Sequence, residues 1–357
     1  MIKVLHVMPM LGVGGASNLM SEIIPSLNTH PGIKAELAIS KFLDKSFLPR
    51  YEKAGVNVHV IGGGNTHSLK NIFQISRLIK DYDIVHVHLF PSLYWVAFAN
   101  IFIKKTLVYT EHSTSNSRRG KWFLRGIEKW AYNHYRKIIC ISEQTKNSLR
   151  DWIKAKDNDS RFEVVNNGVN LDYFKELERK RLYPHTLIMV ARFVAAKDHE
   201  TVIKAMTLLD NDVHLIFVGD GERKSSCEKL VDELGLKERV HFVGVQSDIP
   251  KWLGKADIGI QSSHWEGFGL AAVEMMAAEL PVVASDVDGL KQVVDGAGVL
   301  FPHGDYEKLA EEVKRLLSDK EYYNHTQFKC LERSNSYGIE STVQKYIDIY
   351  KNILRCK

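Results

Sequence analysis

The chain has 357 residues, of which 45% are hydrophobic and 25% are charged, and its formal net charge is +5. This composition is that of an ordinary globular protein with enough residues for about two domains, each with its own core. The net charge is too small to indicate nucleic-acid binding, and no apolar run is long enough for a membrane span. We expect no signal peptide, because Lys3 and His6 interrupt the first apolar residues.

Four cysteines are scattered along the chain without the paired spacing of a zinc site. They are Cys140, Cys227, Cys330 and Cys356. We therefore expect neither a zinc site nor a disulfide framework, and a reduced, cytoplasmic compartment for the protein.

Short apolar strands alternate with amphipathic helices along the first half, which indicates a parallel sheet with crossover helices. We expect strands at residues 3–9, 35–40, 56–61, 84–89, 106–110 and 137–141. We expect helices at residues 16–27, 69–80, 89–103 and 121–136. Ser142 is suited to cap the helix that follows the sixth strand.

The second half repeats this alternation. We expect strands at residues 187–190, 214–218, 240–242, 257–260 and 281–284, and helices at 198–209, 222–234, 249–253, 271–278 and 306–317. The sequence thus predicts an α/β protein with two Rossmann-like domains, at residues 1–170 and 171–338. In residues 339–357, apolar side chains recur at helical spacing, which predicts a helix that returns to the first domain.

A glycine-rich loop, Gly12-Val13-Gly14-Gly15-Ala16-Ser17, follows the first strand and opens a helix. It half matches the dinucleotide-binding pattern, but Ser17 stands where the third glycine belongs, and Ser40-Lys41 replaces the expected acidic residue. A nicotinamide-dependent dehydrogenase is therefore disfavoured. The backbone amides of Gly14 and Gly15 remain suited to face a phosphate group.

Histidines mark two strands of the first half. His112 follows the strand at residues 106–110, at the edge where open α/β sheets bind ligands, although an ordinary loop histidine is an equal alternative. His86 and His88 lie two residues apart and share one face of their strand. The sequence offers no evident third metal ligand, so we favour buried structural histidines, one of which lines the binding site.

In the second half, Arg192 and Lys197 follow one strand and suit a diphosphate, although two ordinary surface cations are the alternative. A second loop, Glu266-Gly267-Phe268-Gly269-Leu270, follows another strand and leads into a helix that carries Glu274. The carboxylates can accept from hydroxyl groups, while the glycine backbone and the helix start suit an anion. A sugar nucleotide has both kinds of group. Asp286-Val287-Asp288 resembles a metal-binding pattern of other transferases, but we expect it to be a loop beside the site.

Residues 118–137 hold seven basic residues against one acid, Glu128, and five aromatic side chains. Phe123, Ile127, Trp130 and His134 fall on one helical face. One interpretation is a helix packed on the core with a cationic outer face. The other is a contact with an anionic membrane or with a lipid-linked pyrophosphate acceptor.

Several of these motifs occur in the order typical of glycosyltransferase family 4, and the chain resembles that family over nearly its whole length. They are Gly14-Gly15, Glu111-His112, Asn166-Asn167-Gly168-Val169-Asn170, Ala191-Arg192, Lys197, Gly219-Asp220-Gly221-Glu222, Glu266-Gly267-Phe268-Gly269-Leu270 and Glu274. The family usually has Gly at position 191, Pro-Glu at 195–196 and Asp at 170, where this chain has Ala, Ala-Ala and Asn. These departures concern loop geometry and remove no charged group of the site.

The resemblance implies a GT-B fold, in which two Rossmann-like domains face each other across a cleft. It implies catalytic roles for His112, Arg192, Lys197 and Glu266. It implies donor binding by Gly14, Gly15, Gly219, Gly267, Phe268, Gly269, Leu270, Ala271 and Glu274. No metal and no other cofactor is implied.

The activity implied is retaining transfer of a hexose or N-acetylhexosamine from a nucleoside-diphosphate sugar, UDP being the favoured nucleotide. The acceptor implied is a glycan or lipid-linked glycan of a bacterial surface polysaccharide such as lipopolysaccharide. We expect a cytoplasmic protein that contacts the inner face of the plasma membrane. A nucleotide-sugar epimerase of the same fold and a non-catalytic nucleotide-sugar-binding protein remain alternatives.

Overall fold

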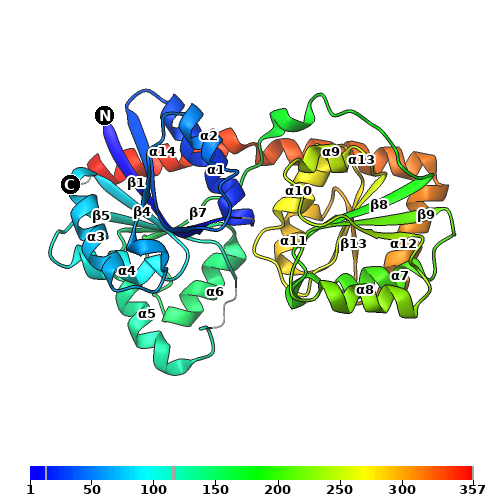
Figure 1. Cartoon of the computed structure of the whole chain (residues 1–357), viewed down its shortest axis with the longest axis horizontal. Helices are drawn as coiled ribbons and strands as arrows, with labels where there is room; N and C mark the ends of the chain where they lie inside the picture. Colours follow the sequence, from blue (N-terminus) through cyan, green and yellow to red (C-terminus); the bar gives the residue numbers. More distant parts are fainter. Residues whose placement is uncertain (13, 115–117, 356–357) are drawn as a thin grey trace. The chain divides into compact units, whose positions relative to one another are not determined.

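The computed structural model describes residues 1–12, 14–114 and 118–355. The chain divides into two compact units (Figure 1). Unit 1 consists of residues 1–168 with 339–357, and unit 2 consists of residues 169–338. The first boundary therefore lies two residues before the predicted one, and the last segment of the chain belongs to the first unit.

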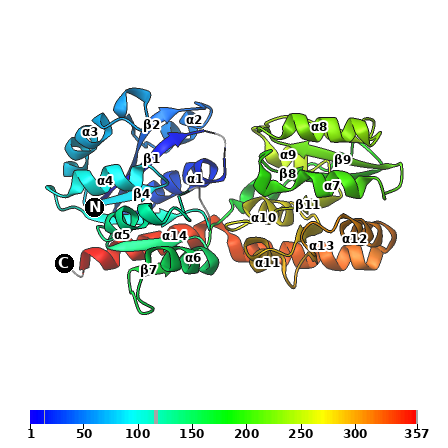
Figure 2. The same cartoon turned by 90° about the horizontal axis from the view of Figure 1, so that it is seen from below.

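Unit 1 contains a seven-stranded parallel sheet in the order β3-β2-β1-β4-β5-β6-β7. Its strands are β1 (Ile2–Leu11), β2 (Ile33–Phe42), β3 (Val58–Val60), β4 (Ile84–His88), β5 (Thr106–Glu111), β6 (Lys137–Cys140) and β7 (Phe162–Val164). Its helices are α1 (Gly15–Thr29), α2 (Leu48–Lys53), α3 (Lys70–Leu78), α4 (Ser92–Asn100), α5 (Arg125–Tyr132), α6 (Glu143–Ile153) and α14 (Ile339–Arg355). Helices lie on both faces of the sheet (Figures 1 and 2), so β4 and β5 are buried along their whole length.

Helix α14 is an integral part of unit 1. It packs against α1, and its apolar side chains Val343, Ile347 and Ile353 are buried. Two buried tyrosines of α14 reach the sheet: Tyr350 hydrogen-bonds His86 and Tyr346 hydrogen-bonds Thr110. The helical spacing of these side chains thus matches a face that completes the core.

Unit 2 contains a six-stranded parallel sheet in the order β10-β9-β8-β11-β12-β13. Its strands are β8 (His185–Val190), β9 (Val213–Val218), β10 (Val240–Phe242), β11 (Ile258–Gln261), β12 (Val282–Ser285) and β13 (Val299–Phe301). Its helices are α7 (His199–Met206), α8 (Lys224–Glu233), α9 (Ile249–Leu253), α10 (Leu270–Ala277), α11 (Asp288–Val294), α12 (Tyr306–Ser318) and α13 (Lys320–Ser334).

Each sheet has one point at which the strand order reverses. It lies between β1 and β4 in unit 1 and between β8 and β11 in unit 2. Loops at such a point leave the sheet in opposite directions and open a crevice at the carboxyl ends of the strands, where α/β proteins bind ligands. The candidate residues of both units follow these strands or the strand next to them.

The structure differs from the sequence prediction in several elements. The strands β7 and β13 and the helices α2, α11 and α13 were not predicted, and the helix predicted at residues 121–136 is a 3₁₀ turn (Trp122–Leu124) followed by the shorter α5. The prediction for Ser142 is confirmed, since its Oγ accepts from the Thr145 N–H at 3.0 Å. Cys140, Cys227 and Cys330 are buried thiols, and Cys356 lies outside the described residues.

Candidate functional site

Two loops of unit 2 carry the charged candidates. The loop after β8 holds Arg192 and Lys197, and the loop after β11 holds Glu266. Because β8 and β11 are neighbouring parallel strands, both loops leave the sheet at the same edge. They are joined by a backbone hydrogen bond from the His264 N–H to the Ala196 carbonyl oxygen at 2.9 Å.

Lys197 and Glu266 form an ion pair across these loops, with 20% and 18% of their side chains exposed. Arg192 is exposed, and its side chain has no hydrogen bond or ion pair with any residue that the structure describes. The structure therefore brings Lys197 and Glu266 together and leaves the guanidinium of Arg192 accessible at the same strand end. A site with two cations and one carboxylate is suited to a ligand with a diphosphate and hydroxyl groups.

The backbone of the Glu266 loop is closely packed. A Cβ at Gly289 would lie 2.2 Å from the Glu266 carbonyl oxygen, and a Cβ at Gly269 would lie 2.8 Å from the Leu290 side chain. Gly269, at φ 92°, is the left-handed residue before α10, and no side chain caps this helix. The amides of its first turn, at Leu270 and Ala271, are therefore available to an anion.

Phe268 is a core residue rather than a ligand-contacting side chain. Its ring is 2% exposed and packs edge-on against Tyr337, with 5.4 Å between the ring centroids. Any contact that Phe268 makes with a donor is thus limited to its backbone.

Glu274 lies one helical turn into α10 and is half-buried. Burial raises the pKa of its carboxyl to about 7. The group consequently changes between carboxyl and carboxylate near neutral pH, and only the carboxylate accepts hydrogen bonds with both oxygens.

Gly219 packs closely against the loop that carries Arg192. Its φ is +143°, and a Cβ there would lie 2.0 Å from the carbonyl oxygen of Ala191. Gly221 makes a similar approach to the Phe193 carbonyl oxygen, at 2.4 Å. These glycines allow the loop after β9 to pack directly on the loop that carries Arg192, which is a structural reason for the Gly-Asp-Gly motif.

In unit 1, the glycine loop ends at Gly14 and α1 begins at Gly15, with no side-chain cap. The Gly12 N–H donates to Ser17 Oγ at 3.2 Å. Ser17, which breaks the dinucleotide pattern, thus closes the loop on itself. Val13 lies outside the described residues.

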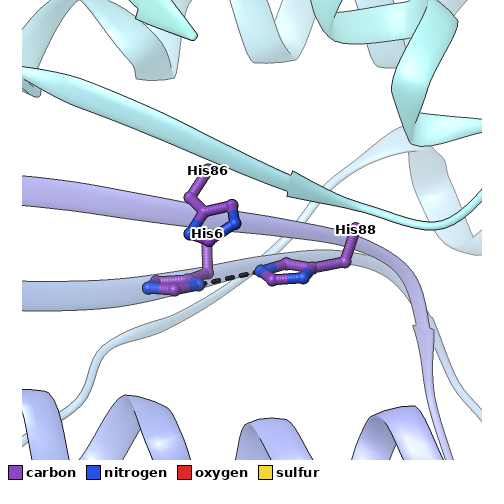
Figure 3. Close-up of side chains that lie close together, drawn as sticks. All are labelled: His6, His86 and His88. Carbon is purple, nitrogen blue, oxygen red and sulfur yellow. Dashed lines mark hydrogen bonds between the residues drawn. The ribbon is translucent and has the colours of Figure 1, made fainter. Parts of the chain in front are cut away.

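His112 directly follows β5 and is half-buried, and it belongs to a group of four histidines. Its Nε2 lies 3.1 Å from His88 Nδ1, and His88 Nε2 lies 3.0 Å from His6 Nδ1 (Figure 3). His86 hydrogen-bonds the Tyr350 hydroxyl at 2.5 Å and Thr110 Oγ1 at 2.7 Å. Burial lowers the pKa of His112 to about 4, that of His6 to about 3, and that of His86 and His88 well below the ordinary value.

Sequence reasoning missed His6, which supplies the third imidazole beside His86 and His88. His6 and His86 are paired in register on β1 and β4, and this adjacency was not visible before the strands were ordered. Three imidazoles this close could hold a metal ion in principle. Both nitrogens of His86 are already hydrogen-bonded, however, so the arrangement fits a hydrogen-bonded cluster better than a metal site.

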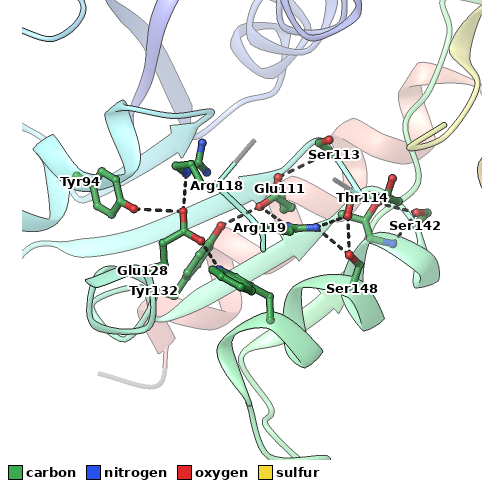
Figure 4. Close-up of polar contacts among 12 residues, drawn as sticks. Tyr94, Glu111, Ser113, Thr114, Arg118, Arg119, Glu128, Tyr132, Ser142 and Ser148 are labelled. Carbon is green, nitrogen blue, oxygen red and sulfur yellow. Dashed lines mark hydrogen bonds and ion pairs between the residues drawn. The ribbon is translucent and has the colours of Figure 1, made fainter. Parts of the chain in front are cut away.

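Arg118 and Arg119 each pair with a buried carboxylate (Figure 4). Arg119 pairs with Glu111 at 3.1 Å, and the Tyr132 hydroxyl donates to Glu111 at 2.8 Å. Arg118 donates to Glu128 at 2.5 Å. Two of the seven basic residues, Arg118 and Arg119, are therefore paired with buried carboxylates and do not belong to a cationic outer face.

The predicted aromatic face is only half exposed. Phe123 is 63% and Ile127 42% exposed, whereas Trp130 and His134 are half-buried and Trp130 packs against the core. The neighbouring Trp122 is 77% exposed, and the buried residues of α5 are Glu128, Ala131 and Tyr132. No helix of the described chain has the length and apolarity of a membrane span.

The predicted loop at Asp286-Val287-Asp288 is only partly correct. Asp288 is the first residue of α11, and Asp286 pairs with Lys291 at 3.1 Å on the surface.

Comparison with known proteins gives consistent matches. Residues 13–173 match the family described as glycosyltransferase family 4, and residues 173–328 match the family described as glycosyl transferases group 1. The putative glycosyltransferase EpsD of Bacillus subtilis is 27% identical over 306 positions, covering 78% of this chain and 79% of EpsD. The UDP-Gal:alpha-D-GlcNAc-diphosphoundecaprenol alpha-1,3-galactosyltransferase of Escherichia coli is 26% identical, covering 98% of this chain and 96% of that enzyme.

The fold has solved counterparts. HepE of Anabaena, in complex with UDP-glucose, superposes with a TM-score of 0.85 at 19% identity, covering 99% of this chain and 100% of HepE. At this identity the likeness concerns the fold, which is GT-B: two Rossmann-like domains with parallel sheets.

Proposed function

The chain belongs to the group 1 glycosyltransferases of family 4, and on that premise we propose that it transfers a hexose or N-acetylhexosamine from a UDP-sugar with retention of configuration. The acceptor that we propose is a glycan or a lipid-linked glycan of a surface polysaccharide such as lipopolysaccharide.

The observation that carries this proposal is the set of Arg192, Lys197 and Glu266 at the strand-order reversal of unit 2. The Lys197 ammonium is balanced by the Glu266 carboxylate. In this proposal, a bound donor provides new partners for both members of this ion pair. Its diphosphate takes Lys197 and Arg192, and its sugar hydroxyls donate to Glu266.

The same groups account for the chemistry. The bond between the anomeric carbon and the diphosphate breaks while the acceptor oxygen bonds that carbon on the same face. The acceptor proton passes to the leaving phosphate oxygen. Lys197 and Arg192 stabilise the negative charge that develops on this phosphate, and we propose that they do so without a metal ion.

The choice of UDP is supported by relatives rather than by a base-specific contact. HepE binds UDP-glucose, and the Escherichia coli relative is described as using UDP-Gal. Glu274 is the residue that we propose accepts hydrogen bonds from the ribose hydroxyls. The Escherichia coli relative and one from Campylobacter jejuni are described as acting on diphosphoundecaprenol-linked sugars, which supports a lipid-linked acceptor here.

The test is turnover of a panel of UDP-sugars by the full chain, with and without a lipid extract that contains polyprenyl-diphosphate glycans. We expect acceptor-dependent UDP release with one donor, and a product with the anomeric configuration of that donor. Lys197→Met should lower turnover by about 100-fold or more, whereas Lys229→Met, at a lysine with a 79% exposed side chain, should not. Epimerised donor without acceptor indicates the epimerase, and binding without UDP release indicates a binding protein.

We also propose a cytoplasmic protein that contacts the inner membrane face through Trp122, Phe123 and Ile127. These exposed side chains are accompanied by the exposed Lys121 and Lys129. Apolar side chains flanked by lysines suit a surface of anionic lipid.

Sedimentation with vesicles tests this contact. The wild type should sediment with phosphatidylglycerol vesicles. The double variant Trp122→Ser with Phe123→Ser should not sediment with them. Phe328→Ser, at a comparably exposed phenylalanine of unit 2 (62%), should bind like the wild type. Equal sedimentation of all three proteins would contradict the contact.

A further inference from the structure

The four-histidine cluster includes His112, for which the family resemblance implies a catalytic role. The hydrogen bonds of the cluster bear on which ring nitrogen of His112 carries the proton. We propose that His6 and His88 are positioning residues which fix the tautomer of His112, so that His112 offers an Nδ1–H donor. The proposal rests on the proposed function only for the identity of the group that receives this hydrogen bond, a donor oxygen.

The three imidazoles form one hydrogen-bonded line. His6 lies on β1, His88 ends β4 and His112 follows β5, so the line crosses the strand-order reversal of unit 1. Figure 3 shows the hydrogen bond between His6 and His88. The rings of His6 and His88 are stacked, with centroids 5.3 Å apart. The line ends at His112 Nδ1, which has no hydrogen-bond partner among the residues that the structure describes.

Each imidazole in the line is neutral, because burial lowers its pKa far below neutrality. A neutral imidazole has one N–H and one bare nitrogen, so each hydrogen bond fixes the tautomer of the next ring. Only two arrangements satisfy both hydrogen bonds: either all three protons lie on Nδ1, or all three lie on Nε2.

His6 decides between these two arrangements. Its Nε2 is buried and has no partner within the described chain. If the protons lie on Nε2, this position is a buried N–H without an acceptor, which is the rarer kind of unpaired group in proteins. If they lie on Nδ1, the position is a bare nitrogen. The all-Nδ1 arrangement is therefore favoured, and His112 then offers its N–H at the open end of the line.

The arrangement suits the proposed ligand. A nucleotide sugar presents phosphate and hydroxyl oxygens, which accept hydrogen bonds. A neutral imidazole can donate a hydrogen bond to these oxygens only if its accessible nitrogen carries the proton. His86 is a separate branch, since Tyr350 and Thr110 occupy both of its nitrogens.

The test is ¹⁵N NMR of the full chain with labelled histidine, which distinguishes protonated from bare ring nitrogens. Assignment uses the loss of the His112 signals in His112→Gln. We expect a protonated Nδ1 on His112 in the wild type. In His6→Asp, the carboxylate can only accept, so His88 must donate to it from Nε2 and the proton on His112 should move to Nε2. In His6→Asn, the side-chain amide can still donate to His88, so the wild-type tautomer should be kept. A wild-type His112 protonated on Nε2, or one unchanged in His6→Asp, overturns the proposal.

Kinetics supply a second measurement. In the active transferase, His6→Asp should lower kcat about tenfold with little change in the KM for the donor, and His6→Asn, which can still donate to His88, should keep most of the wild-type kcat. If every variant lost the Nδ1–H tautomer of His112 and also melted at a lower temperature, the cluster would have only a structural role. The NMR measurement needs no substrate, so it tests the tautomer of His112 even if the protein turns over no UDP-sugar. Failure of this proposal can therefore be distinguished from failure of the proposed function.

Discussion

At the proposed donor site, Lys197 and Glu266 balance each other's charge. Each group is about four-fifths buried, and an unpaired charge in such a position is unfavourable. In the proposed complex, a phosphate of the donor replaces Glu266 as the partner of Lys197, and donor hydroxyls replace Lys197 as the partners of Glu266. Removing one partner therefore affects the other as well, so loss of activity after substitution at Lys197 has two components.

Glu274 gives a prediction for pH dependence. Its pKa in the folded chain is raised to about 7, so the carboxylate that we propose binds ribose hydroxyls is lost as pH falls through 7. UDP affinity should fall between pH 8 and pH 6 by more in the wild type than in Glu274→Gln. Titration of the UDP phosphate affects both proteins equally, and calorimetry of the two proteins isolates the difference. Parallel pH profiles would remove Glu274 from the ribose site.

The same shift affects stability with a definite sign. A carboxyl whose pKa is raised on folding binds more protons in the folded state, so its contribution to stability falls as pH rises from about 4.5 to about 7. Glu274→Gln should therefore melt at a higher temperature than the wild type at pH 8. The wild-type carboxylate would then be kept for binding rather than for stability.

At the scale of elements, loop packing rather than side-chain chemistry positions Arg192. The loop after β9 contacts the Ala191 and Phe193 carbonyls through Gly219 and Gly221. A larger residue at either position displaces the backbone that carries Arg192.

Gly219→Ala tests this packing, with Gly304→Ala as its control. Both glycines have positive φ, but a Cβ at Gly304 would have no atom within 4 Å. We expect Gly304→Ala to cost about 1 kcal/mol of unfolding free energy from backbone strain alone, and Gly219→Ala about 3 kcal/mol, since a clash is added. Urea unfolding measures both. Equal losses of unfolding free energy in the two variants would mean that the loop carrying Arg192 moves to accommodate the added Cβ at no energetic cost.

The sequence was sufficient for the elements with strong periodicity. Long apolar strands such as β1 and β4, and glycine loops at strand ends, are local features, so the two-domain α/β fold and most candidate residues could be predicted. Strands of three residues are too short to show a period, so β7 and β13 were missed although the equally short β3 and β10 were predicted. Helix α13 is mostly polar and was missed for that reason. These elements depend on packing that no local pattern records.

The contacts of the site were less predictable than its residues. The ion pairs of Arg118 with Glu128 and of Arg119 with Glu111 were not predicted, because they join residues that share no sequence spacing rule. Likewise, His6 becomes informative only when β1 is placed beside β4. Long-range pairing of this kind has to be observed in a structure.

At the scale of the whole molecule, the chain leaves unit 1 after Gly168 and returns to it at Ile339. The return supplies α14, whose buried tyrosines complete the core around His86 and Thr110. Unit 1 is therefore built from two distant pieces of the chain, and its stability requires the last helix.

Truncation tests this requirement. Removal of residues 339–357 should lower the melting temperature or abolish soluble expression, because it exposes the apolar face that α14 covers on α1 and the sheet. Removal of residues 356–357 alone should change neither. A truncated chain that melts like the full chain would show that α14 is dispensable for the core.

The central claim is that the strand-order reversal of unit 2 binds a nucleoside diphosphate through Arg192 and Lys197. Calorimetric titration of UDP into the full chain tests it most directly, beside Lys197→Met, Arg192→Gln and the surface control Lys229→Met. We predict binding by the wild type and the control, and a loss of about tenfold or more in affinity for each site variant, as expected when a charged hydrogen bond is removed. Equal affinity in all four proteins, or binding of NAD in place of UDP, would contradict the account.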